Sequence, residues 1–185
     1  MNKQNTPAVI LAVLLILAAA ISRVVMYPNN FSPIIGMAIF AGAVINDKRL
    51  AFILPLASML LADVLFEVFN IAPGFWGWGQ LVGYGILALI TIIAFNLKKI
   101  NVVNVFGFSI ASSIIFFILS NLSFFLIDNP IYHTYTQDAN GFIQCYVQAL
   151  PFFRTSVIAD LVYSGVLFGA YSTVNSYVIK KQAVA

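Results

Sequence analysis

Two carboxylates lie in a stretch that otherwise has the apolar composition of a membrane-spanning helix. Asp63 and Glu67 occupy MLLADVLFEVF, residues 59–69, four positions apart. Residues with this spacing share one face of a helix, and two neighbouring anions there require cations or a shared proton. A charged side chain at bilayer depth costs at least about 2.5 kcal/mol. This cost indicates that the pair has a role in binding a ligand or in bracing helices.

Further polar residues lie at a similar depth in other apolar segments. Arg23 and Arg154 are the cations available to the pair, and Asp160 adds a third acid. With a rise of about 1.5 Å per residue, these side chains fall in the half of their segments that lies away from the lysine-rich connections. So many polar groups in one leaflet favour a functional site. We expect the site to be lined by Arg23, Asp63, Glu67, Asn121, Arg154 and Asp160.

A purely structural role for these groups is the alternative. The acids would then only pair with the two arginines and lock the helices together, or cap helix ends. Arg23, Glu67 and Arg154 are close enough to the segment ends for their charged heads to reach the membrane interface. The residues by themselves leave both interpretations open.

Other kinds of chemistry have little support. His133 has no second histidine and no HExxH motif, and Cys145 is the single cysteine, which excludes an intramolecular disulfide and a multi-cysteine metal site. The sequence contains neither a Gly-rich phosphate loop nor a GxSxG nucleophile motif. We therefore expect no enzyme activity, no resident cofactor and no metal.

The composition is that of an integral membrane protein. Of the 185 residues, 62% are hydrophobic and 8% are charged, whereas soluble domains carry about a quarter charged residues. So few charges cannot cover a water-exposed globule, so most of the surface must face lipid. The net charge is +3, but most lysines and arginines lie between apolar segments, where such residues set membrane topology. The charge therefore does not indicate nucleic-acid binding. We predict an all-α membrane protein with a single domain, residues 1–185.

Apolar segments of helical length position the candidate residues. They lie at about residues 8–26, 33–46, 50–69, 80–97, 103–127 and 155–179. The first segment follows Lys3 and contains an A-x-A pattern at Ala18, Ala19 and Ala20, and we expect an uncleaved helix here, not a secretory signal. The second segment is short for a hydrocarbon core of about 30 Å. We predict a bundle of six transmembrane helices.

The basic residues give this bundle an orientation. Seven of the nine fall on one side: Lys3, Lys48, Arg49, Lys98, Lys99, Lys180 and Lys181. The positive-inside rule makes that side cytoplasmic, so both termini are expected inside. Three connections then face outward, at residues 27–32, 70–79 and about 128–154.

Aromatic residues in the longer outer connections are candidates for ligand contacts. Trp76 and Tyr132 are expected to stack on a ring-shaped substrate. Trp76 also suits an aromatic belt at the level of the lipid headgroups, which needs no ligand.

Several segments resemble a known family of membrane subunits. They are NFSPIIGMAIFAGAV at 30–44, PLASMLLADV at 55–64 and ALPFFRTSVIADLVYSGVLFG at 149–169, together with the small-residue pair Ala8 and Ala12. With the predicted layout, they resemble the S components of energy-coupling factor (ECF) transporters, and more narrowly an S-component-like bacterial family. The resemblance implies a vitamin-binding subunit of the bacterial cytoplasmic membrane that docks through Ala8 and Ala12 onto an ECF transmembrane scaffold with two ATPase subunits.

We therefore expect a substrate-binding subunit of a micronutrient uptake transporter, with a pocket that opens away from the cytosol. The alternatives are a structural or accessory membrane subunit and a proton-coupled carrier that uses Asp63 and Glu67 as relay groups. The substrate stays open. Arginines suit a carboxylate or phosphate, carboxylates suit an amine or a thiazolium-like cation, and a tetrapyrrole would use His133 or Cys145 as an axial ligand.

Overall fold

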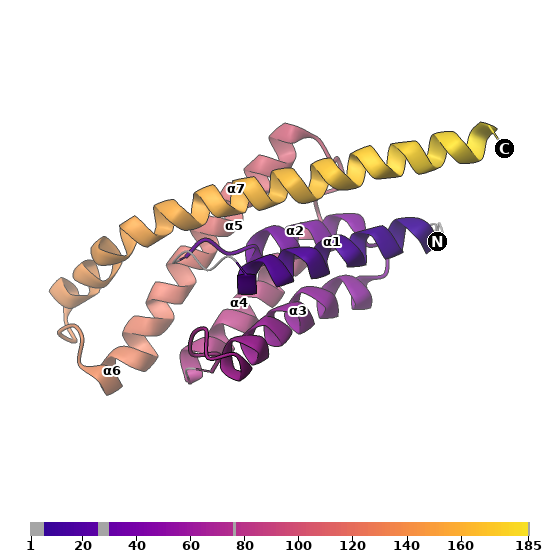
Figure 1. The fold of residues 1–185 in the computed structure, drawn as a ribbon. Helices are drawn as coiled ribbons and strands as arrows, with labels where there is room; N and C mark the ends of the chain where they lie inside the picture. Colours follow the sequence, from indigo (N-terminus) through magenta and orange to yellow (C-terminus); the bar gives the residue numbers. More distant parts are fainter. Residues whose placement is uncertain (1–5, 26–29, 76, 185) are drawn as a thin grey trace.

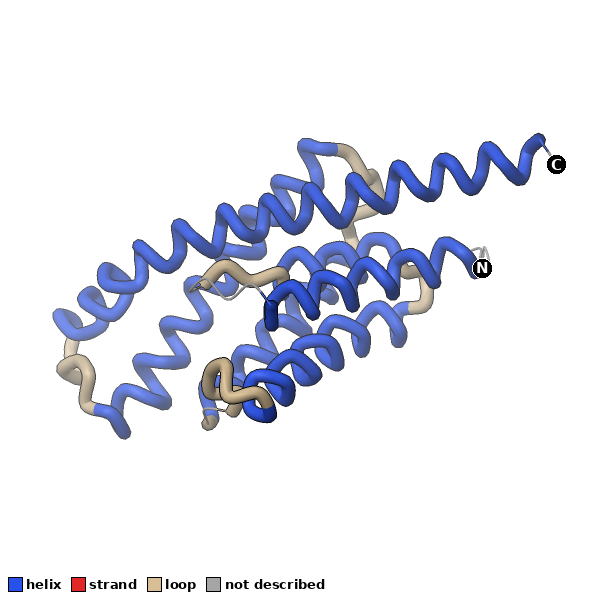
Figure 2. Tube along the Cα trace, in the orientation of Figure 1, coloured by secondary structure: helices blue, strands red, loops and turns tan. Residues whose placement is uncertain are grey.

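The computed structural model describes residues 6–25, 30–75 and 77–184, and every regular element in these residues is a helix (Figures 1 and 2). The prediction of an all-α fold is therefore confirmed. The helices are α1 (Thr6–Val25), α2 (Ile34–Val44), α3 (Lys48–Val68), α4 (Trp78–Ala94), α5 (Val102–Ser123), α6 (Asn129–Tyr132) and α7 (Ala139–Val184), and a π-helical turn, η1 (Phe124–Asp128), joins α5 to α6.

The helices have the length and composition of a membrane protein. Within the described residues, four helical stretches are long and apolar enough to cross a membrane. They are α1, α3, the continuous stretch from α5 to α6, and α7 as far as Ser176. The remaining apolar helices, α2 and α4, are shorter.

The short helix α2 lies at the centre of the bundle. It contacts α1, α3, α4, α5 and α7, and nine of its 11 residues are buried. Its sequence, IIGMAIFAGAV, is apolar all round, as expected for a helix surrounded by others. Gly42 allows a close approach to α4, because a Cβ added there would lie 2.7 Å from the Cβ of Ala94.

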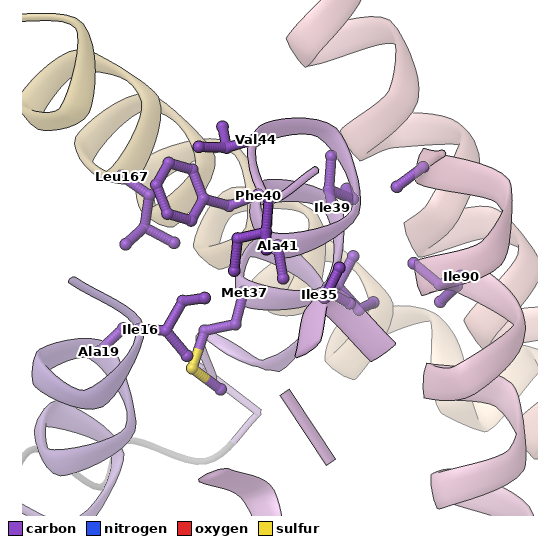
Figure 3. Packing of buried hydrophobic residues seen from close by; sticks show 14 of the residues in the cluster. Ile16, Ala19, Ile35, Met37, Ile39, Phe40, Ala41, Val44, Ile90 and Leu167 are labelled. Atoms are coloured by element: carbon purple, nitrogen blue, oxygen red, sulfur yellow. The ribbon is translucent and has the colours of Figure 1, made fainter. Parts of the chain in front are cut away.

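The apolar core fills one half of the bundle. Ile16 of α1 and Met37 of α2 lie side by side, and Phe40 packs near Leu167 of α7 (Figure 3). The Phe40 ring also meets the Phe168 ring edge-on, with centroids 5.2 Å apart. The core also includes Ala51 near the start of α3, Ala94 at the end of α4 and Val105 near the start of α5. The tightly packed half therefore adjoins the α2–α3 and α4–α5 connections.

The basic connections gather at this packed end. Lys48 begins α3, and its ammonium donates to the carbonyl oxygen of Gly42 at 3.2 Å. The same ammonium lies 4.4 Å from the ring centroid of Phe95, just after α4. The α2–α3 connection and the end of α4 therefore lie together.

The structure differs from the prediction in the connection expected at about 128–154. Most of it is helical, because α6 continues η1 and α7 begins at Ala139, well before residue 155. Asp138 stabilises the start of α7: its Oδ1 accepts from the backbone N–H of Gly141 at 2.8 Å, and its carbonyl oxygen accepts from the N–H of Phe142 at 3.0 Å. Pro151 lies inside the helix without ending it.

Candidate functional site

A cavity of about 580 Å³ lies among the helix ends remote from Lys48. Its lining comes from the end of α1, the start of α2, α3, the start of α4, the second half of α5, η1 and the first half of α7. The polar lining residues are Arg23, Asn30, Ser32, Ser113, Ser120, Asn121, Ser123, Asp128, Ser156 and Asp160. The bundle therefore has one solid half and one hollow, partly polar half.

One face of α5 forms a long wall of the cavity. Ser113, Phe117, Ser120 and Phe124 all line it and recur at spacings of three and four residues, which places them on the same side of a helix. The Phe117 ring packs against Phe153 of α7 with a centroid distance of 4.5 Å. The wall thus alternates hydroxyl groups with aromatic rings.

Arg23 and Asp63 form a buried ion pair at the edge of the cavity. The guanidinium Nη1 lies 2.7 Å from Asp63 Oδ1, and the side chains are 16% and 3% exposed. Asp63 Oδ2 accepts two further hydrogen bonds, from Gln80 Nε2 at 2.9 Å and from the Tyr84 hydroxyl at 2.6 Å. The carboxylate thus ties α1, α3 and α4 together.

The connection after α3 covers this ion pair. Gln80 Nε2 also donates to the carbonyl oxygen of Gly74 at 2.7 Å, and the N–H of Gly74 donates to Glu67 Oε2 at 3.0 Å. Only glycine fits at position 74, because an added Cβ would collide with the backbone carbonyl oxygen of Asp63. Glu67 is exposed, so it positions the connection and does not face the cavity.

Asp160 of α7 lies in the cavity wall directly beside α5 and is 2% exposed. Its Oδ2 lies 2.6 Å from the Ser113 hydroxyl, which is also 2.9 Å from the carbonyl oxygen of Ser109. The single hydroxyl proton of Ser113 is therefore shared between two acceptors. No Lys, Arg or His of the described chain forms an ion pair with Asp160.

Asp128 is a cavity residue that the sequence analysis did not select. It is 7% exposed and lines the cavity, and its carboxyl group has no hydrogen-bond or ion-pair partner among the residues that the structure describes. The π-helical turn η1 ends at this residue, and such turns are frequent at functional sites. The sequence signal was an acid directly after an apolar run and before Asn-Pro.

Of the other predicted site residues, one lines the cavity and two do not. Asn121 lines it and donates to the carbonyl oxygen of Phe117 at 2.8 Å. Arg154 is exposed, and Tyr132 is 65% exposed; neither lines the cavity. Trp76 lies outside the described residues.

The small-residue pair of α1 does not form an open face. Ala12 is 0% exposed and belongs to the apolar core, whereas Ala8 is partly exposed. Ala12 therefore packs inside the bundle and is unavailable to a partner in this conformation. The residues of α1 that face outward are larger, with Ile10 and Leu14 both more than half exposed.

These observations define an all-helical protein of membrane composition with an internal polar cavity at one end. By sequence, the chain belongs to DUF6580, a family of unknown function whose model matches residues 3–183. No curated protein matches the chain. No solved structure matches it either.

Proposed function

We propose that this protein is the substrate-binding membrane subunit of an uptake system for a small micronutrient, similar to the S components of ECF transporters. The observation that carries the proposal is the cavity, whose volume of about 580 Å³ falls within the range of about 300–1,000 Å³ typical of small-molecule sites. Its lining combines aromatic side chains with a few buried polar groups, which is the usual composition of such sites.

The distribution of charge supports an outward-facing cavity. In the proposal all six major helices cross the bacterial cytoplasmic membrane, and both termini lie inside. Lys48 and the neighbouring basic residues mark the packed end, and the positive-inside rule assigns that end to the cytoplasm. The cavity lies at the opposite end and would then be open to substrate arriving from outside.

The proposed partners are an ECF transmembrane scaffold and two ATPase subunits. The buried position of Ala12 argues against docking through the Ala8–Ala12 face in the conformation described. Docking would therefore use other exposed apolar residues of the bundle or require α1 to turn.

A structural role is the second candidate, and the Arg23–Asp63 pair favours it. Asp63 accepts hydrogen bonds from three side chains on two other helices, which is the arrangement of a helix brace. By contrast, Asp63 and Glu67 bind different groups in the described residues, and nothing in their contacts favours a proton relay.

Filling the cavity separates the two candidates. Ser120→Trp places a large side chain in the cavity wall, whereas Ile118→Trp makes the same change on α5 at a position that is 46% exposed and lies outside the cavity lining. Each protein would be purified in mild detergent from its native membranes. Small molecules released on denaturation would then be identified by mass spectrometry.

We expect the wild type and Ile118→Trp to retain the same small molecule and Ser120→Trp to lose it while remaining monodisperse. Equal small-molecule content in all three proteins, or none in the wild type, would refute the binding function. Copurification of scaffold and ATPase subunits in the same preparations would support the transporter assignment.

A further inference from the structure

Among the described residues, the cavity lining holds more buried carboxyl groups than cations to pair with them. The lining contains one arginine, and its guanidinium is already paired with Asp63 at 2.7 Å. The two lining aspartates, Asp128 and Asp160, have no cation beside them among the described residues. A buried carboxylate without a counter-charge is unfavourable, so either it binds a proton or a cation must approach it.

The two acids stand at different levels of the cavity. Asp160 is joined to Ser113 in the middle of α5, whereas Asp128 ends η1 on the same continuous helix. With about 1.5 Å of rise per residue, Ser113 and Asp128 are about 20 Å apart along the axis. One compact cation therefore contacts one acid at a time. Asp160 is the deeper of the two, and Asp128 lies nearer the α6 end.

Unsatisfied polar atoms also point to a missing ligand. The hydroxyl oxygens of Ser32 and Ser123 are buried without a hydrogen-bond partner in the described structure, and both residues line the cavity. Buried hydroxyls nearly always find a partner, so these two are available to a polar ligand group. Together with the Asp128 carboxyl group, they are three polar groups in the lining that have no partner within the described part of the chain.

The apolar part of the lining suits a flat, cationic molecule. Phe117 and Phe153 present adjacent rings on the cavity wall. The faces of aromatic rings attract cations and stack on other rings. The charge of Arg23 is already balanced by Asp63, so an anionic molecule would gain less from it than from an unpaired arginine, and it would be repelled by ionised Asp128 and Asp160.

We propose that the cavity takes an organic cation, an amine or a ring-nitrogen cation on a flat apolar body, with Asp160 as its counter-charge and Asp128 as the acid that it meets nearer the α6 end. The proposal rests on the binding function proposed above and specifies the charge of the substrate. It also assigns the Arg23–Asp63 pair to bracing and not to substrate contact.

A series of three indole compounds tests the charge directly. Tryptamine is a cation at neutral pH, tryptophol is neutral and indole-3-acetate is an anion, yet all three carry the same ring. Binding would be measured by titration calorimetry on the full chain in nanodiscs of neutral phosphatidylcholine. We expect saturable binding by tryptamine. The other two compounds should bind at least about tenfold more weakly.

Variants then assign the counter-charge. Asp160→Asn is expected to weaken tryptamine binding about tenfold while leaving tryptophol unchanged. Asp138→Asn makes the same substitution outside the cavity, at the start of α7, and is expected to bind like the wild type. Asp128→Asn provides a second cavity variant if Asp160→Asn does not fold, and it should also weaken the binding of tryptamine.

Each outcome has a distinct meaning. Tighter binding by indole-3-acetate or tryptophol, or undiminished tryptamine binding by both cavity variants, would overturn the cation proposal and leave a binding subunit in place. Saturable binding by none of the three compounds would overturn the cation proposal, and the copurification experiment would then decide separately whether the cavity binds a small molecule at all.

Discussion

Arg23 and Asp63 lie forty positions apart in the chain and join α1 to α3 through an ion pair of 2.7 Å. Because Asp63 also accepts from Gln80 and Tyr84 of α4, this one carboxylate connects three helices beside the cavity. These contacts are those of a brace between helices.

The brace predicts strong coupling between its two charges. Arg23→Leu leaves a buried carboxylate without its cation and is expected to destabilise the protein by about 3–5 kcal/mol. Adding Asp63→Leu should recover part of this loss, because no unpaired charge then remains. Thermal unfolding in detergent, followed by size-exclusion chromatography, measures both variants. Additive losses in the double variant would contradict the assignment.

The close contact of α2 with α4 predicts opposite effects of two similar substitutions. Gly42→Ala places a Cβ 2.7 Å from both the Ala94 Cβ and the Thr91 carbonyl oxygen, and such overpacking costs about 1–3 kcal/mol. Gly107→Ala meets no atom within 4 Å, so the better helix propensity of alanine should stabilise the protein by about 0.5–1 kcal/mol. Melting temperatures of the two variants give the comparison, and a stable Gly42→Ala protein would show that α2 and α4 are packed less closely.

The start of α7 predicts a dependence on pH. Donation from the Gly141 N–H, and also from the Thr136 hydroxyl, holds the pKa of the Asp138 carboxyl below its usual value. A lowered pKa contributes stability above the unfolded-state pKa of about 3.9, and this contribution is lost as the pH falls through the lower folded-state pKa.

Hydrogen exchange of residues 139–142 tests this cap. In the wild type, the protection of these backbone amides, measured relative to their intrinsic exchange rates, should fall below about pH 4. Asp138→Asn can still cap the helix but cannot titrate, so its protection should not change across that range. Asp138→Ala should be weakly protected at every pH. An identical pH profile for the wild type and Asp138→Asn would exclude Asp138 as the titrating group.

The proposed orientation predicts which loops react with an impermeant maleimide. Cys145 would be replaced by serine, and single cysteines would be introduced at the exposed positions His133 and Lys99. His133→Cys should be labelled in cells whose cytoplasmic membrane is intact but whose outer layers admit the reagent. Lys99→Cys should be labelled only after the cytoplasmic membrane is opened. The reverse pattern would place the cavity on the cytoplasmic side.

The sequence was sufficient to predict the helices, and it singled out Arg23, Asn121 and Asp160, which line the cavity, but it did not predict the partners of these side chains. The cost of burying Asp63 and Asp160 follows from their apolar neighbours alone, and Arg23 was one of two cations available to them. Which arginine pairs with Asp63 depends on the rotation of each helix, and no sequence pattern gives that angle. Gln80 and Tyr84 escaped notice for the same reason, since their role depends on the contact of α4 with α3.

Local capping explains most of the remaining differences. Arg154 was expected near the start of the last helix, but the cap at Asp138 begins α7 much earlier and leaves Arg154 exposed and away from the cavity. The spacing of Glu67 and Asp63 places them on one helix face. The connection after α3 folds back, however, so that Gly74 lies against the Asp63 carbonyl oxygen and donates its backbone N–H to Glu67. Asp128 was passed over because its position depends on the π-helical turn.

The length of α7 has a consequence for how the molecule sits in a bilayer. Its 46 residues correspond to a rod of about 70 Å at about 1.5 Å per residue, whereas a bilayer with its headgroups measures about 40–45 Å. Even at a tilt of about 40° the rod is longer than that thickness. If α7 crosses the bilayer, several of its turns must therefore project into water, and Figure 1 shows its last turns running past the start of α1.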